Sequence, residues 1–254
     1  MNKHLAILEE MGCKGLELSP SMIWNNLINV NKKEIIQLKN NIEKFGLEIP
    51  SMHSLTYQRP ELNFFESKDI RLELINYIVK LAEMANILHC PVMIFGSARS
   101  REINERDREE CWHIMSEVFY QMAKRIKPLG VSLLIEPLSR NYTDSINTTE
   151  EGAALVHKVN HPNFGLHIDL KSSFYENEDQ SKIWTKYGVY IRHCHVANPG
   201  LAPPNHDCVE HFAAAKAIQC SVYDGYVSIE MGRHFVKTQN KVAQALDFVK
   251  ETYF

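Results

Sequence analysis

Short apolar runs alternate with longer amphipathic segments along nearly the whole chain. An apolar run of four to eight residues bounded by turn residues is typical of a buried β-strand. Glycine stands shortly before several of the runs, where it can end a preceding helix in the left-handed conformation. Seven runs fit this description: residues 15–20 (GLELSP), 47–55 (LEIPSMHSL), 91–97 (PVMIFGS), 131–137 (VSLLIEP), 164–170 (FGLHIDL), 189–196 (VYIRHCHV) and 226–231 (YVSIEM).

The segments between these runs have the period of α-helices. Apolar residues that step by three or four positions form one face of a helix. One such set is Trp112, Met115, Phe119, Met122 and Ile126. Ser67 and Thr148 are expected to cap helices at their N-termini, and Glu151 completes a capping box with Thr148. A last helix is expected over residues 237–253.

Strands that alternate with helices predict parallel pairing through right-handed crossovers. Such an α/β chain can form an open doubly wound sheet or a closed (β/α)8 TIM barrel. An open sheet gathers its functional residues at one switch point, whereas a barrel brings the ends of all strands to one mouth. Polar residues follow or end nearly every run, which favours the barrel, as a single domain over residues 1–254: Glu17, His53, Ser97, Glu136, Asp169, His195 and Glu230.

The start of the chain departs from this pattern. The first expected element is a helix over residues 3–11, and no strand-like run precedes it. A closed eight-stranded barrel needs one strand more than the seven runs supply. We therefore expect a TIM barrel that lacks its first strand or is truncated there. The uncovered edge of such a sheet would favour a homodimer.

Four of the polar residues are ligands that divalent cations prefer. Glu136, Asp169, His195 and Glu230 each end a separate apolar run, at the same phase of the repeat. Carboxylate and imidazole groups that converge at one barrel mouth can hold a single metal ion. The alternative for any one of them is a charge at the rim; for Glu136 this would be an ion pair with Arg140 or Lys171.

Other residues are candidates for contacts around the ion. His167 lies two residues before Asp169 and faces the same way, so it can orient a ligand, contact substrate or be a hydrogen-bonded core histidine. Glu17, His53 and Arg99 end or follow earlier runs and are expected to line the substrate pocket, although hydrogen bonds or solvated charges at the rim also fit. His193 lies deeper on its strand than His195 and is interpreted as structural.

Composition narrows the class of protein. Hydrophobic residues make up 44% of the chain and charged residues 23%, as in soluble globular proteins. The net charge of -3 gives no basic surface for nucleic acid. No apolar run is long enough to cross a membrane, and no signal peptide is recognisable. The six cysteines form no CxxC pair, which predicts reduced thiols in the cytoplasm.

The motifs around the four candidate ligands resemble those of a known family. The stretch from Ile135 to Leu170 (IEPLSRNYTDSINTTEEGAALVHKVNHPNFGLHIDL), together with HCHV and YVSIEM, is similar to the xylose isomerase-like TIM-barrel superfamily. The similarity is to its sugar and sugar-phosphate isomerases and epimerases of the ketose 3-epimerase type. It implies one divalent cation, manganese first and magnesium, cobalt or zinc as alternatives, held by Glu136, Asp169, His195 and Glu230. The two glutamates would be the acid and the base.

This resemblance implies proton transfer through a metal-stabilised enediolate of a sugar or cyclitol. Three positions depart from the family pattern. This chain has Ser172 where the family often has a histidine, Leu201 where it often has an arginine, and Tyr142 where the epimerases have an acid. These positions contact substrate hydroxyls, so the substrate is not implied. The alternatives are a dehydratase of the inosose or dehydroshikimate type, a non-catalytic barrel, and a nuclease resembling AP endonucleases.

Overall fold

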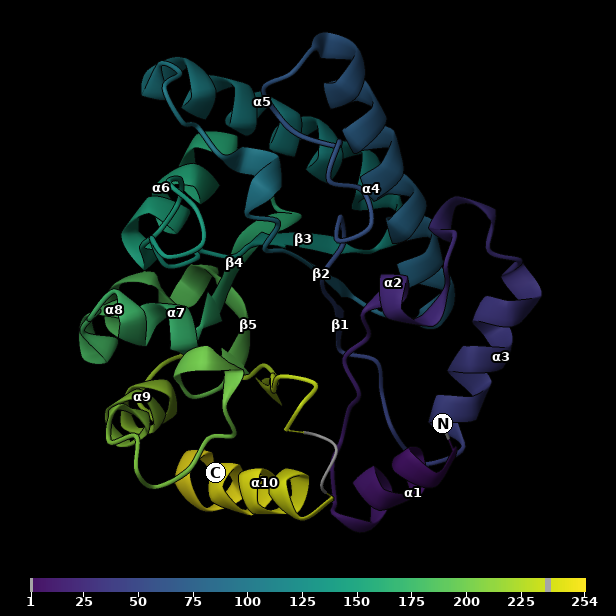
Figure 1. Ribbon diagram of the computed structural model, residues 1–254, viewed down its shortest axis with the longest axis vertical. Helices are drawn as coiled ribbons and strands as arrows, with labels where there is room; N and C mark the ends of the chain where they lie inside the picture. Colours follow the sequence, from purple (N-terminus) through teal and green to yellow (C-terminus); the bar gives the residue numbers. More distant parts are fainter. Residues whose placement is uncertain (1, 236–238) are drawn as a thin grey trace. The chain divides into compact units, whose positions relative to one another are not determined.

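The computed structural model describes residues 2–235 and 239–254, and these form two compact units. The first unit comprises Met1–Ile135 and Leu155–Gly165, and the second comprises Glu136–Ala154 and Leu166–Phe254. Both units are built from parallel strands with helices between them, as the hydrophobic pattern predicts (Figure 1).

The first unit contains three strands that pair in the order of the sequence. β1 is parallel to β2, and β2 is parallel to β3, with Val92 opposite Ser132. The elements up to Ile135 are α1 (Asn2–Glu10), α2 (Pro20–Ile23), η1 (Leu27–Asn29), α3 (Lys32–Glu43), β1 (Ser51–Met52), α4 (Lys68–Leu88), β2 (Val92–Phe95), η2 (Arg99–Arg101), α5 (Arg108–Ile126), η3 (Lys127–Leu129) and β3 (Ser132–Ile135).

The expected strand at residues 15–20 is present only as two isolated parallel bridges. Gly15 pairs with Glu48, and Leu18 pairs with Met52. Pro20 begins α2 and has no N–H with which to continue the hydrogen-bonded pairing of the strand. The run therefore forms no more than these two bridges. Within the described residues, six of the seven expected runs form strands and no strand precedes α1.

The second unit continues the alternation of strands and helices. β4 is parallel to β5, and β5 is parallel to β6. The expected helix over residues 237–253 is present from Gln239 onward, and Lys237 lies outside the described residues. The elements after Ile135 are α6 (Thr149–Val159), β4 (Phe164–Asp169), α7 (Leu170–Tyr175), α8 (Gln180–Tyr187), η4 (Gly188–Tyr190), β5 (Ile191–Val196), η5 (Pro199–Leu201), α9 (Glu210–Gln219), β6 (Val227–Ile229) and α10 (Gln239–Tyr253). Residues 155–159 of α6 and 164–165 of β4 belong to the first unit.

Several of the sequence signals for helix ends are confirmed, but not the one at Gly188. The hydroxyl of Ser67 accepts a hydrogen bond from the N–H of Ile70 at 3.2 Å and caps α4. Gly46 and Gly130 have φ of 65° and 68°, a conformation in which a side chain would be strained. Gly188 has φ of −51° and opens η4, so here the glycine is not needed for a left-handed turn.

The core of the first unit includes a cluster of four phenylalanine rings. One ring comes from the segment that precedes α4, and the others come from β2, α5 and β4. Phe119 lies at its centre, with ring centroids 4.9 Å from Phe64, 5.2 Å from Phe95 and 4.9 Å from Phe164. Tilted and edge-to-face pairs of this kind add about 0.5–1.5 kcal/mol each beyond the burial of their area. Among the described helices, none has the length and apolar character of a membrane span.

Candidate active site

Three of the four predicted metal ligands are buried at the ends of their strands. Glu136 is 8% exposed, Asp169 2% and His195 1%. Asp169 lies directly opposite His195 in the pairing of β4 with β5, so alternation along the strands turns both side chains to the same face. Glu230 directly follows β6, and its N–H donates to the carbonyl of Val196 at 3.1 Å. All four residues belong to the second unit.

The side chains of this cluster approach one another closely. Nδ1 of His195 lies 3.6 Å from Oε2 of Glu230, and Nε2 of His167 lies 3.9 Å from Oε1 of Glu136. Ligand atoms of Glu136, His167 and His195 all lie within 4.8 Å of one another. The structure therefore brings His167 into the candidate metal group. The sequence had predicted that His167 orients a ligand, contacts substrate or is a core histidine, and not that it could be a ligand itself.

Asp169 has polar partners on both of its carboxylate oxygens. It caps α7, and Oδ1 accepts the backbone N–H of Lys171 at 3.0 Å. Nζ of Lys171 lies 2.8 Å from Oδ2, and the hydroxyl of Ser172 donates to the same oxygen at 3.4 Å. A carboxylate at a helix N-terminus that also binds an ammonium is held in one orientation.

Burial and the neighbouring acids raise the pKa of Glu136. Burial raises the pKa of Glu136 well above that of an ordinary glutamic acid, and the carboxylates of Asp169 and Glu230 raise it further. His195 and Lys171 act in the opposite direction. Burial alone would lower the pKa of Lys171, but Asp169, Glu230 and Glu136 outweigh that effect and raise it. The cluster thus carries more negative charge than its lysine neutralises.

His193 lies one layer below the cluster, as the two-residue spacing indicates. Its Nε2 is 3.1 Å from the hydroxyl of Ser228 on β6. Its ring stacks on that of His167, with centroids 5.5 Å apart and an angle of 24° between the planes. These contacts agree with a structural role, since they hold His167 in place from below.

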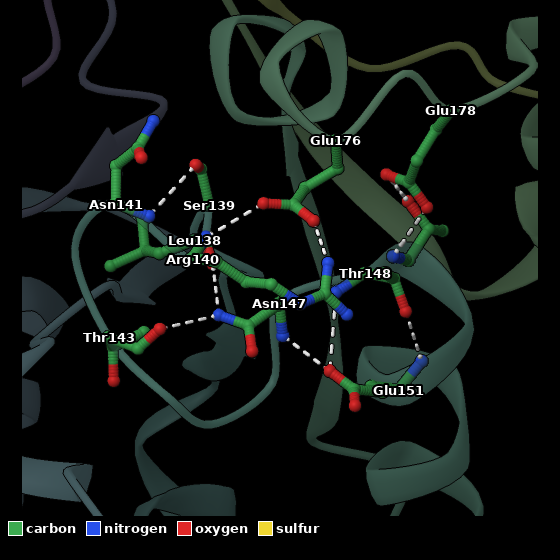
Figure 2. A network of polar contacts seen from close by, with 11 residues as sticks. Leu138, Ser139, Arg140, Asn141, Thr143, Asn147, Thr148, Glu151, Glu176 and Glu178 are labelled. Atoms are coloured by element: carbon green, nitrogen blue, oxygen red, sulfur yellow. Dashed lines mark hydrogen bonds and ion pairs between the residues drawn. The ribbon is translucent and has the colours of Figure 1, made fainter.

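The loop after Glu136 is fixed by its own hydrogen bonds (Figure 2). The side-chain amide of Asn147 donates to the carbonyls of Leu138 and Thr143, both at 2.8 Å. At the start of α6, the hydroxyl of Thr148 accepts the N–H of Glu151 at 3.2 Å, and the Glu151 carboxylate accepts the N–H of Thr148 at 3.4 Å. This reciprocal pair is the predicted capping box.

A second part of the network ties this loop to the segment that follows α7. Glu176 accepts the backbone N–H of Arg140 at 2.7 Å and forms an ion pair with its guanidinium (Figure 2). Glu178 accepts the N–H and the hydroxyl of Thr149, both at 2.9 Å. Glu176 thereby engages Arg140, one of the two residues considered as an ion-pair partner for Glu136, while the other, Lys171, acts electrostatically on Glu136.

The three candidates from the early part of the chain lie in the first unit. Oε1 of Glu17 is 3.8 Å from Nδ1 of His53, and the hydroxyl of Ser51 donates to the other oxygen of Glu17. Glu17 and His53 are half-buried, and Arg99 is exposed on η2. A role for these three in substrate binding stays a prediction.

The chemistry of the second-unit cluster fits a divalent cation. It combines buried carboxylates with imidazole nitrogens, and the crowding of its acids is the condition that a 2+ charge relieves. Lys171 is the residue that sequence reasoning missed, because it was weighed only as an ion-pair partner for Glu136. The available signal was a lysine two residues after Asp169, at the first turn of a helix.

Comparison with known proteins identifies the family of the chain. The sequence model of the xylose isomerase-like TIM barrel matches residues 5–252. A probable ketose 3-epimerase of Synechocystis sp. is 26% identical over 204 residues, which cover 77% of this chain and 68% of that protein. An L-ribulose 3-epimerase of Methylomonas sp. is 26% identical over 157 residues, 61% of this chain and 51% of that protein.

A solved structure extends the comparison to the fold. The D-psicose 3-epimerase of Clostridium cellulolyticum H10, determined with D-tagatose, superposes with a TM-score of 0.86 at 19% identity, over 99% of this chain and 93% of that one. The predicted TIM-barrel fold is therefore confirmed, and the open doubly wound sheet is excluded. The chain belongs to the xylose isomerase-like TIM-barrel family.

Proposed function

We propose that this chain is a ketose epimerase that depends on a divalent metal ion and acts on a small sugar. The similarity to named ketose and ribulose 3-epimerases supports an epimerase. The observation that carries the proposal is the geometry of the cluster: Nδ1 of His195 lies 3.6 Å from Oε2 of Glu230, and ligand atoms of His195, Glu136 and His167 lie within 4.8 Å of one another. Two carboxylates beside one metal-binding imidazole can serve for proton removal and proton return.

Glu136, Asp169, His195 and Glu230 would hold the ion, with His167 as a further candidate. A divalent cation bound there supplies Lewis-acid polarisation of the ketose carbonyl and the neighbouring hydroxyl, which acidifies the C–H bond between them. Manganese is the first candidate, with magnesium, cobalt and zinc as alternatives, because carboxylates and imidazole suit all four ions.

The two glutamates would divide the proton transfers. One carboxylate removes the proton from the carbon next to the carbonyl and leaves an enediolate. The other carboxylate donates a proton to the opposite face of that carbon, so the configuration is inverted.

The surroundings of the cluster indicate that the substrate is contacted differently from the family pattern. Ser172 is buried against Asp169, where the family has a histidine. Tyr142, which replaces an acid, is exposed, and its ring lies 5.5 Å from Nζ of Lys171. We therefore expect a ketose or a closely related cyclitol ketone, with hydroxyl contacts made by other residues.

Proton NMR in deuterated water tests the reaction. The chelator-treated protein is supplied with Mn²⁺ and a panel of ketoses and inososes. An epimerase exchanges the hydrogen at the carbon next to the carbonyl for deuterium and forms the epimer, and no water is lost. Loss of water with a new enone signal would instead identify the dehydratase alternative. No exchange on any substrate, with the metal bound, would contradict the proposal.

A further inference from the structure

Lys171 is a buried cation inside the acid cluster, and its side chain is 7% exposed. It lies in the first turn of α7, with Nζ 2.8 Å from Oδ2 of Asp169. The ring of Tyr142 lies 5.5 Å from the same nitrogen and covers it on another side. Lysine is rarely buried without a charged partner, so this placement points to a specific role.

The ammonium contacts the carboxylate of Asp169 directly, with Nζ 2.8 Å from Oδ2. The acids Glu230 and Glu136 also favour the charged form of Lys171, so its pKa is raised in spite of burial. Lys171 is therefore the ammonium group within this group of acids. This positive charge stabilises a group of acids that would otherwise repel one another.

A divalent ion would need the same carboxylate. Both oxygens of Asp169 already accept hydrogen bonds, Oδ1 from the N–H of Lys171 and Oδ2 from its ammonium and from the hydroxyl of Ser172. An ion coordinated to Asp169 would lie within a few ångströms of the ammonium. Like charges at that separation repel strongly in a buried site, where screening by water and salt is weak.

We propose that Lys171 is the built-in counter-cation of this site. Its ammonium binds Asp169 and offsets part of the negative charge of the neighbouring acids. A divalent cation coordinated by Asp169 would compete with this ammonium, which lowers the affinity of the site for metal. The inference rests on the proposed metal site, and it adds that Lys171 limits how tightly the chain binds its ion.

A lysine with a purely structural role predicts something different. If Lys171 only oriented Asp169, its removal would weaken metal binding and lower stability together. If Lys171 is a counter-cation, its removal changes the two properties in opposite directions. The metal-free protein becomes less stable, and its affinity for metal rises. The expected rise is about tenfold or more, because like charges a few ångströms apart in a partly buried site repel by more than the ~1.4 kcal/mol that a tenfold change in affinity represents.

The test uses the full chain after treatment with chelator and Mn²⁺ alone as the probe. Calorimetric titration and melting temperature are compared for wild type, Lys171→Met, Lys171→Arg and Lys186→Met. Lys186 is the matched control, because it is an exposed lysine that pairs with Glu150 at 3.1 Å. Without metal, Lys171→Met is expected to melt lower than wild type by about 5–10 °C.

With Mn²⁺, Lys171→Met is expected to bind at least about tenfold more tightly than wild type, with one ion per chain. Lys171→Arg keeps the charge and is expected to bind as weakly as wild type, and Lys186→Met is expected to be unchanged. Equal or weaker binding by Lys171→Met would overturn the inference.

Glu136→Gln separates this inference from the proposed function. If Glu136→Gln loses Mn²⁺ binding while Lys171→Met binds no better than wild type, the metal site stands and the role of Lys171 is wrong. If neither wild type nor any variant binds Mn²⁺, both the metal site and the counter-cation are wrong. Should Lys171→Met fail to fold, Lys171→Gln replaces it, because its amide retains a hydrogen-bond donor but no charge.

Discussion

His211 is a fully buried histidine with a hydrogen bond on each ring nitrogen. Nε2 lies 2.7 Å from Oδ1 of Asn198, and Nδ1 lies 2.6 Å from the hydroxyl of Tyr253. The amide oxygen can only accept, so Nε2 carries the proton and Nδ1 accepts from the tyrosine. This arrangement satisfies the neutral ring and joins α9, α10 and the segment after β5.

The neutral state of His211 makes stability depend on pH. Burial lowers its pKa to about 4, against a smaller opposing effect of Glu210. The unfolded chain therefore binds a proton near pH 6.5 that the folded chain binds only near pH 4. Stability from this residue is complete above about pH 6.5 and is lost as the pH falls toward 4, by up to ~3 kcal/mol.

Urea unfolding at pH 7.5 and pH 5 checks this expectation. His211→Gln has no group that titrates in this range, so its stability should fall less than that of wild type between the two pH values. His157→Gln, which changes an exposed histidine of α6, should keep the full dependence. An equal fall in wild type and His211→Gln would show that the pH dependence arises elsewhere.

The sequence indicates candidate ligands of the site but not their partners. Glu136, Asp169 and His195 stand out as candidates because each is a polar residue at the end of an apolar strand. The contact of Lys171 with Asp169 depends on how α7 leaves β4 and on the direction of a long side chain. Neither is encoded in a hydrophobic pattern, and the same holds for the approach of His167 to Glu136.

At the scale of elements, α6 packs closely against the chain that leaves Glu136. Gly152 lies inside α6, and a Cβ built there would meet Leu166 Cδ1 at 2.6 Å and Pro137 Cγ at 2.8 Å. Pro137 directly follows Glu136, so the close approach of this helix helps to set where the carboxylate lies. The glycine is needed for space rather than for its backbone conformation.

Gly152→Ala should therefore destabilise the protein. Alanine in a helix normally adds roughly 0.5–1 kcal/mol over glycine, but overpacking costs about 1–3 kcal/mol. We expect a net loss of about 1–2 kcal/mol in urea unfolding. Gly188→Ala is the control, because the nearest atoms to its Cβ are 3.9 Å and 4.0 Å away, and a change within about 0.5 kcal/mol is expected. A gain in stability for Gly152→Ala would contradict this packing.

Most of the helices and strands could be predicted from the sequence, and the predictions that were wrong have local causes. The capping box of Thr148 and Glu151 and the apolar face of α5 follow short-range rules that the structure confirms. The run at residues 15–20 has the composition of a strand, but Pro20 starts a helix and leaves only isolated bridges. Gly188 precedes a strand as the other glycines do, yet it opens a 3-10 turn.

At the scale of the whole molecule, the proposed metal ligands belong to one compact unit. Glu136, Asp169, His195 and Glu230 lie in the second unit, whereas the predicted substrate contacts Glu17 and His53 lie in the first. The proposed metal binding and proton transfer are therefore assigned to residues of the second unit, which begins at Glu136. The barrel itself could be predicted from the repeat of strands and helices, while the division into two units could not, because the repeat runs through it unchanged.

The central claim is that four side chains distant in sequence hold a single ion. Elemental analysis of wild type beside Glu136→Gln, both dialysed against Mn²⁺ and then against metal-free buffer, tests it most directly. The account predicts about one metal ion per wild-type chain and a large loss in the variant, with both proteins folded by circular dichroism. A folded wild type that takes up no metal, or a variant that retains as much as wild type, would contradict it.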